Sequence, residues 1–158
     1  MKLNIIKYLT VVLSLTVFII SLTKNAVIID YQNISIVPSF DYFIMGSTAL
    51  LGGGLLEEII WLANPLCLIS IFLLLYNNKA AKKLSLIALV IAASFSTWKE
   101  ILGAENGAMA RIISLESGYY LWILSIFILT SGTHIYFKIA GPDLDKLSTF
   151  QLKKPRIF

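Results

Sequence analysis

Charged residues are scarce in this chain of 158 residues, making up 14% of it, whereas hydrophobic residues make up 58%. A soluble domain carries roughly 25% charged residues, so this chain would expose too much apolar surface in water. The shortage excludes the soluble classes and predicts an integral membrane protein. The net charge of +4 then reflects orientation in a bilayer and not binding to nucleic acid, because the basic residues lie beside apolar segments.

Cysteine and histidine each occur once, as Cys67 and His134. A single cysteine excludes an intramolecular disulfide and a C-x-x-C redox pair. A single histidine leaves too few ligands for a metal site at its end of the chain, and no glycine-rich phosphate loop followed by lysine is present. The sequence therefore predicts a protein that is not an enzyme and holds no cofactor or metal.

Four apolar stretches are long enough to cross a membrane, at about 5–23, 59–76, 84–98 and 118–138. They predict an all-α fold, an integral membrane bundle of four transmembrane helices, in a single polytopic domain over residues 1–158. Gly141-Pro142 is expected to end the last helix and to start a cytoplasmic tail over 139–158.

Two stretches, 24–41 and 99–117, read as polar linkers between these helices. Within the first, residues 34–37 have the composition of a short strand or extended piece that Pro38 ends.

The apolar stretch 42–76 is interrupted only by Glu57 and Glu58. As one helix it would be about 52 Å long, well beyond the ~30 Å hydrocarbon core. We favour a short outer interfacial helix over 42–56 followed by one span, in which Pro65 frees the carbonyl of Trp61 and kinks the helix. A hairpin of two spans that turns at 52–58 is the alternative.

Basic residues favour one orientation of the four-span arrangement. With both termini cytoplasmic, ten basic residues lie inside and three outside, which is a strong positive-inside bias. The inner set is Lys2, Lys7, Lys79, Lys82, Lys83, Lys138, Lys146, Lys153, Lys154 and Arg156, and the outer set is Lys24, Lys99 and Arg111.

The candidate site is a polar cluster of Glu57, Glu58, Trp61 and Asn64 at the outer end of the second span. On one continuous helix, three of these, Glu57, Trp61 and Asn64, share a face. This face could bind a cation, a proton or a basic group. The structural alternative places the carboxylates in the headgroup layer and makes Asn64 a link between helices. We expect the cluster to pack against the start of the last span, within an outer aromatic belt of Trp98, Tyr119, Tyr120 and Trp122.

Two short motifs, Trp61-Leu62-Ala63-Asn64-Pro65 and Gly118-Tyr119-Tyr120-Leu121-Trp122, carry one resemblance. The chain resembles small uncharacterised bacterial four-span inner-membrane proteins with a W-x-A-N-P motif and a G-Y-x-L-W motif. The resemblance implies a multi-pass protein of the bacterial inner membrane, with Trp61 and Gly118 at outer ends of spans. It implies no activity.

Three functional hypotheses follow. The leading one is a non-enzymatic protein that acts through a partner or envelope contact at an outer face of residues 46–64 and 99–117. Its partners would be the lipid bilayer and another membrane protein, and no nucleic acid. The first alternative is a small transporter or channel component that uses Glu57 and Asn64. The second is an immunity-type membrane protein against a pore-forming toxin.

Overall fold

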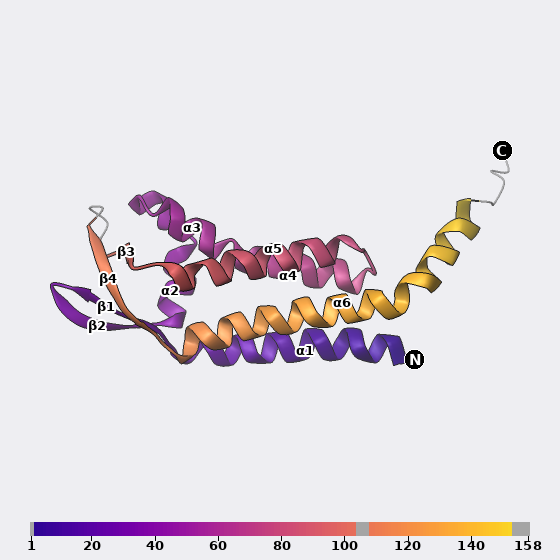
Figure 1. Cartoon of the computed structure of the whole chain (residues 1–158), viewed down its shortest axis with the longest axis horizontal. Helices are drawn as coiled ribbons and strands as arrows, with labels where there is room; N and C mark the ends of the chain where they lie inside the picture. Colours follow the sequence, from indigo (N-terminus) through magenta and orange to yellow (C-terminus); the bar gives the residue numbers. More distant parts are fainter. Residues whose placement is uncertain (1, 104–107, 153–158) are drawn as a thin grey trace.

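The computed structural model describes residues 2–103 and 108–152, with side chains over 3–103 and 108–140. The elements in these ranges are α1 (Lys2–Leu22), β1 (Asn25–Tyr31), β2 (Asn33–Pro38), α2 (Ser39–Gly46), the 3-10 helix η1 (Ala49–Gly52), α3 (Leu55–Trp61), α4 (Ala63–Leu75), α5 (Ala80–Ser94), the 3-10 helix η2 (Phe95–Thr97), β3 (Glu100–Leu102), β4 (Met109–Leu115) and α6 (Ser117–Leu152). The helices run alongside one another, and the strands extend beyond one end of the bundle, called here the sheet end (Figure 1).

Four helical stretches among the described residues are long and apolar enough to cross a membrane. They are Leu3–Leu22, Leu55–Leu75, Ala80–Thr97 and Ser117–Ala140. The predicted number and approximate positions of four such helices are thereby confirmed, because about 20 consecutive apolar residues are a signal that each segment carries by itself.

Hydroxyl groups join neighbouring helices of the bundle. Ser14 Oγ of α1 donates to the carbonyl of Ser125 in α6 at 2.8 Å, and Thr130 Oγ1 of α6 donates to the carbonyl of Ser85 in α5 at 3.0 Å. Small side chains let helix backbones approach closely, and their hydroxyls then reach a carbonyl on the next helix. The same arrangement links α4 to α5, where Ser70 Oγ donates to the carbonyl of Ala81.

A four-stranded antiparallel sheet, in the order β2-β1-β4-β3, covers the sheet end. The prediction of an all-α fold is therefore wrong, because both supposed linkers, 24–41 and 99–117, form strands. The two linkers pair with each other, from Val27 opposite Leu115 to Asp30 opposite Arg111. Val27 and Ile29 are buried on the face of β1 that packs on the aromatic end of the bundle.

The predicted outer helix over 42–56 is also wrong in extent. Helix α2 ends at Gly46, a 3-10 turn follows, and α3 begins at Leu55, inside the second apolar stretch. Gly53 has a φ of 88° at this junction, a left-handed conformation that favours glycine. The glycine run therefore makes a turn between two short helices.

Helix α6 continues to Leu152, so the prediction that Gly141-Pro142 ends it is wrong. The part of it with described side chains holds an apolar stretch of membrane-spanning length, Ser117–Ala140. Proline removes one backbone hydrogen bond, which a helix accommodates by bending, and α6 bends near this point in Figure 1.

A buried lysine ties three elements together at the end opposite the sheet. Lys7 of α1 is buried, and its Nζ donates to the carbonyl of Leu75 and to Oδ1 of Asn77, both at 3.1 Å. The Tyr136 hydroxyl of α6 donates to the same Asn77 oxygen. A cation at the C-terminus of α4 is favourable because the helix dipole leaves its last carbonyls electronegative.

Candidate functional site

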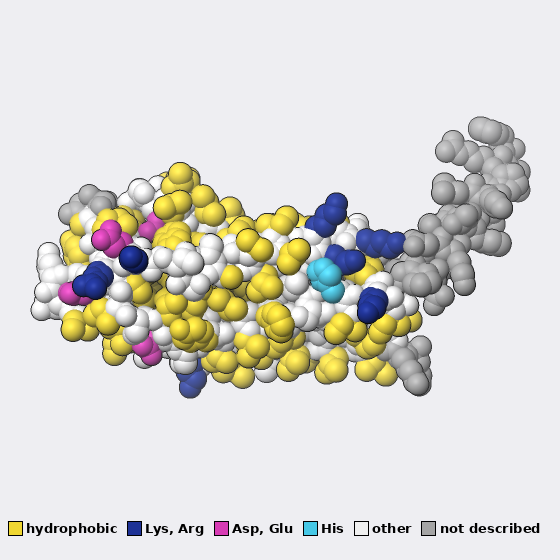
Figure 2. All heavy atoms as spheres, viewed as in Figure 1, with side chains coloured by type: hydrophobic (Ala, Val, Ile, Leu, Met, Phe, Trp, Pro, Cys, Tyr) yellow, Lys and Arg dark blue, Asp and Glu magenta, His cyan; other side chains and the backbone are white. Residues whose placement is uncertain are grey.

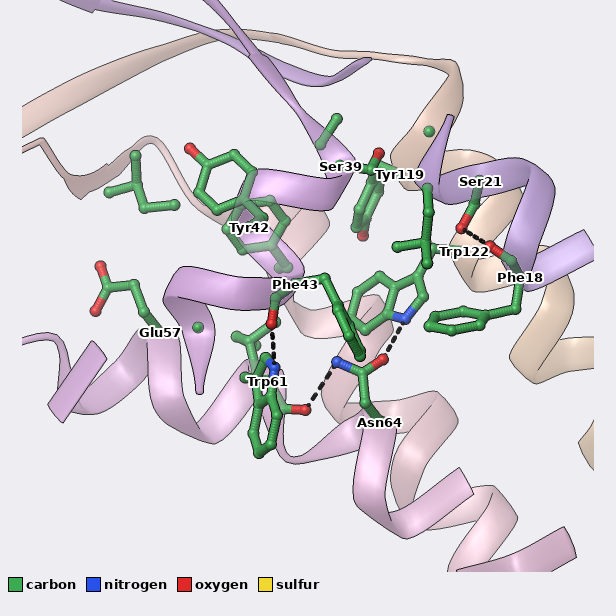
Figure 3. A pocket seen from close by; sticks show the side chains of 17 residues that line it. Phe18, Ser21, Ser39, Tyr42, Phe43, Glu57, Trp61, Asn64, Tyr119 and Trp122 are labelled. Carbon is green, nitrogen blue, oxygen red and sulfur yellow. Dashed lines mark hydrogen bonds between the residues drawn. The ribbon is translucent and has the colours of Figure 1, made fainter. Parts of the chain in front are cut away.

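Asn64 joins the second span to the last one at the sheet end (Figure 3). Its Nδ2 donates to the carbonyl of Trp61 at 3.1 Å, and its Oδ1 accepts from Trp122 Nε1 at 2.9 Å. Pro65 has no N–H and so leaves the Trp61 carbonyl without its usual helical partner. The Asn64 side chain supplies that partner, at a break where α3 ends at Trp61 and α4 begins at Ala63.

Trp61 contacts a different element from Asn64. Its Nε1 donates to the carbonyl of Phe43 at 2.8 Å, so the indole fixes α2 against α3. The polar atoms of this tryptophan are thus used within the fold: the ring nitrogen holds α2, and the backbone carbonyl accepts from Asn64.

The two glutamates point to different places and do not form a pair. Oε1 of Glu57 accepts from the backbone N–H of Leu102 at 2.9 Å, and Oε2 of Glu58 accepts from the N–H of Leu50 at 3.2 Å. Leu102 lies in β3, an edge strand of the sheet. Glu57 therefore covers part of a free strand edge, which would otherwise present an unpaired donor.

Replacing Glu57 by leucine should therefore expose the edge of β3. We expect faster hydrogen exchange at the Leu102 amide and a loss of about 1 kcal/mol in the free energy of unfolding, because a leucine cannot accept the bond. Exchange measured by mass spectrometry on peptides covering β3 tests this. The matched variant Glu58→Leu should leave β3 exchange unchanged and should affect the peptide containing Leu50. Equal effects of both variants on β3 would contradict the assignment.

Tyr42 of α2 lies beside this carboxylate at the sheet end. Burial raises the pKa of its phenol well above the ordinary value, and the nearby charge of Glu57 raises the pKa further. Both effects disfavour the phenolate, so the Tyr42 hydroxyl stays protonated at neutral pH and contributes no charge to the site.

The residues of the predicted aromatic belt pack beneath the sheet. Tyr119 is buried, its ring lies 6.1 Å from that of Trp122, and its hydroxyl donates to the carbonyl of Ala92. Phe95, which the sequence reasoning missed, lies between Trp98 at 5.3 Å and Tyr119 at 5.5 Å. Within an apolar span nothing distinguishes this phenylalanine from its neighbours. Tyr120 is the belt residue that stays exposed.

Two adjoining cavities lie next to Asn64. The outer cavity, about 110 Å³, is under the sheet between α1, α2, α3 and α6. The inner one, about 330 Å³, is between α1, α4 and α6. The residues that line both are Phe18, Phe43, Trp61, Asn64 and Trp122. Of the predicted polar cluster, the structure thus brings Glu57, Trp61 and Asn64 to the outer cavity and leaves Glu58 outside its lining.

Strand β2 is the second surface of interest, and it forms the other edge of the sheet. Ile34 is 70% exposed and Ile36 is 57% exposed. The sequence reasoning identified 34–37 as a short strand but placed the outer face at 46–64 and 99–117. The sequence pattern that could have identified this surface is the alternation of isoleucine with polar residues, which predicts a strand with one apolar face.

Across residues 3–103 and 108–140, no three His, Cys, Asp or Glu side chains lie close enough to hold a metal ion. Comparison of the chain with protein-family models, curated proteins and solved structures gives no match. The class of protein is therefore taken from the structure. Its described part is a bundle with four helices of membrane-spanning length and apolarity, and with a four-stranded sheet at one end.

Proposed function

We propose that this chain is a multi-pass protein of the bacterial inner membrane that acts without catalysis, by holding an extended segment of another envelope protein against β2. The observation that carries the proposal is the exposed edge of β2. An edge strand presents unpaired N–H and C=O groups to any extended chain, and alternating apolar side chains select the segment that fits.

The two edges of the sheet differ in a way that supports this role. Proteins usually protect edges with charge, proline or a covering element. Glu57 of α3 covers β3, whereas β2 has no charged residue, has its proline only at its last position, Pro38, and is mostly exposed. Ile34 and Ile36 lie on one face of β2, so a bound segment with alternating apolar residues would extend that face.

The charge distribution supports an orientation with the sheet outside and both termini in the cytoplasm. On the face shown in Figure 2, acidic side chains lie at the sheet end, whereas basic ones lie at both ends of the bundle. Of the ten residues of the predicted inner set, five belong to the end opposite the sheet: Lys7, Lys79, Lys82, Lys83 and Lys138. The other five have side chains outside the described ranges: Lys2, Lys146, Lys153, Lys154 and Arg156. Basic residues are retained on the cytoplasmic side.

Reporter fusions test this orientation. Fusions after Ser39, Lys83, Gly107 and Phe158 are expected to report outside, inside, outside and inside, because that arrangement puts most basic residues in the cytoplasm. Paired reporters, one active only in the cytoplasm and one only outside it, serve as mutual controls. A fusion after Lys83 that reports outside would contradict the four-span topology.

A photo-crosslinking residue placed at Ile36 tests the binding surface. We expect it to capture one envelope protein in intact cells, and Ile34→Lys to abolish the capture, because a charge on the apolar face blocks strand pairing. Leu51→Lys is the matched control, since Leu51 is also an exposed apolar residue at the sheet end. This variant is expected to leave the capture unchanged. Capture that survives Ile34→Lys, or a crosslink only to a second copy of this chain, would contradict the proposal.

The geometry favours neither alternative function over this one. A transporter that uses Glu57 and Asn64 needs free ligand groups, whereas both side chains make bonds within the fold. The immunity-type hypothesis is the case in which the segment bound at β2 belongs to a pore-forming toxin.

A further inference from the structure

The inner cavity opens on the side of the bundle where α1 and α4 face each other. Leu15 of α1 and Leu68 of α4 line it and are 40% and 52% exposed. Both belong to helices of membrane-spanning length. In a bilayer, this opening therefore faces the hydrocarbon chains of lipids.

The walls of the inner cavity are suited to hydrocarbon. Asn64 lies at its outer end, but both polar atoms of the amide are bonded to Trp61 and Trp122. Ile71 marks the deep end, about 10 Å further along α4 by helical rise. Two hydroxyls also line the cavity, and both donate within the bundle: Ser14 to the carbonyl of Ser125 and Ser125 to the carbonyl of Trp122. An ordered water needs two to four polar partners, and these bonded groups offer it few. The cavity thus fits a narrow apolar chain better than water.

We propose that the inner cavity holds a single acyl chain of a glycerophospholipid from the leaflet at the sheet end. The chain enters between Leu15 and Leu68, lies beside Phe18 and Trp122 and ends near Ile71. The cavity lies between helices of membrane-spanning length, at the depth where a lipid has its hydrocarbon chain. This site is separate from β2 and does not depend on the function proposed for that strand.

Photo-crosslinking with a lipid probe tests the site. The full chain is reconstituted into vesicles of phosphatidylethanolamine and phosphatidylglycerol that contain a fraction of phosphatidylethanolamine with a mid-chain diazirine. Crosslinks located by mass spectrometry are expected on lining residues of the inner cavity that are not exposed, such as Ser14, Phe18, Cys67 and Ile71. Labelling confined to outward-facing residues of the helices would show that only surrounding lipid is contacted, and would overturn the proposal.

A blocked opening provides the matched test. Leu15→Trp is expected to remove most of the crosslink to residues 64–71, whereas Val12→Trp should retain it, because Val12 is exposed on α1 but lines neither cavity. If Leu15→Trp does not fold, Leu68→Trp with Ile69→Trp as its control makes the same comparison on α4. Equal labelling of the blocked variant and its control overturns the proposal.

Discussion

Replacing Gly118 by alanine is expected to lower the free energy of unfolding by about 3 kcal/mol, at the upper end of the cost of overpacking. A Cβ on Gly118 would lie 2.6 Å from the carbonyl oxygen of Asn25 and would also overlap Ser39 Oγ. The Asn25 oxygen belongs to the backbone at the start of β1, so it cannot move aside as a side chain can. The added methyl must therefore separate α6 from β1 and α2. Unfolding in mixed micelles, followed by circular dichroism, measures the loss.

Gly52→Ala is the matched control for this variant. A Cβ on Gly52 would meet only a methyl of Leu102 at 3.8 Å, an ordinary contact distance. We expect a change within about 0.5 kcal/mol, as for most surface substitutions. If the two variants lose equal stability, the close approach of α6 to β1 is not what Gly118 is needed for.

Asn64→Leu is expected to lower the free energy of unfolding by about 2 kcal/mol, because it leaves the Trp61 carbonyl and Trp122 Nε1 without partners in a buried place. A leucine fills a similar volume, so the loss reports mainly the two hydrogen bonds. A loss of an in vivo phenotype with unchanged stability would instead mark Asn64 as part of a functional site.

A double-mutant cycle separates the two bonds of Asn64. Combining Asn64→Leu with Trp122→Phe should cost less than the sum of the two single losses, with a coupling of about 1 kcal/mol, since both remove the same bond. Tyr120 is exposed and lies in the same helix turn as Trp122. Tyr120→Phe should therefore show no coupling to Asn64→Leu. Additive losses for Asn64 and Trp122 would contradict the bond between them.

The helices could be predicted from the sequence because each carries its own signal over about 20 residues. Of the sheet, only the extended stretch 34–37 in β2 could be predicted, from its alternating pattern, and the pairing of the strands could not. Strand β3 has three residues, and β1 finds its partner β4 more than 80 residues along the chain. Short strands of mixed polarity are defined by the partners they meet in space, and the linkers of a membrane protein give no local indication of those partners.

The position of a site residue along the bundle could be predicted, because it follows from where each span begins. The direction in which the residue faces could not, because that depends on whether the helix is continuous. Asn64 and Trp122 both lie near the sheet ends of their helices, so their proximity follows from the order of the four helices. Glu57 was placed on the face of Asn64 by assuming one continuous helix. The break between α3 and α4 turns the two segments relative to each other, and Glu57 therefore meets β3.

Helix α1 packs mainly against α6, and β1 lies between β2 and β4. During synthesis, the side of α1 that contacts α6 has no partner until residues beyond 117 are made, and the β4-facing edge of β1 has none until residues 109–115 are made. A translation product that stops between α5 and β4 therefore exposes both an apolar helix face and an unpaired strand edge, and such surfaces make a chain prone to aggregate.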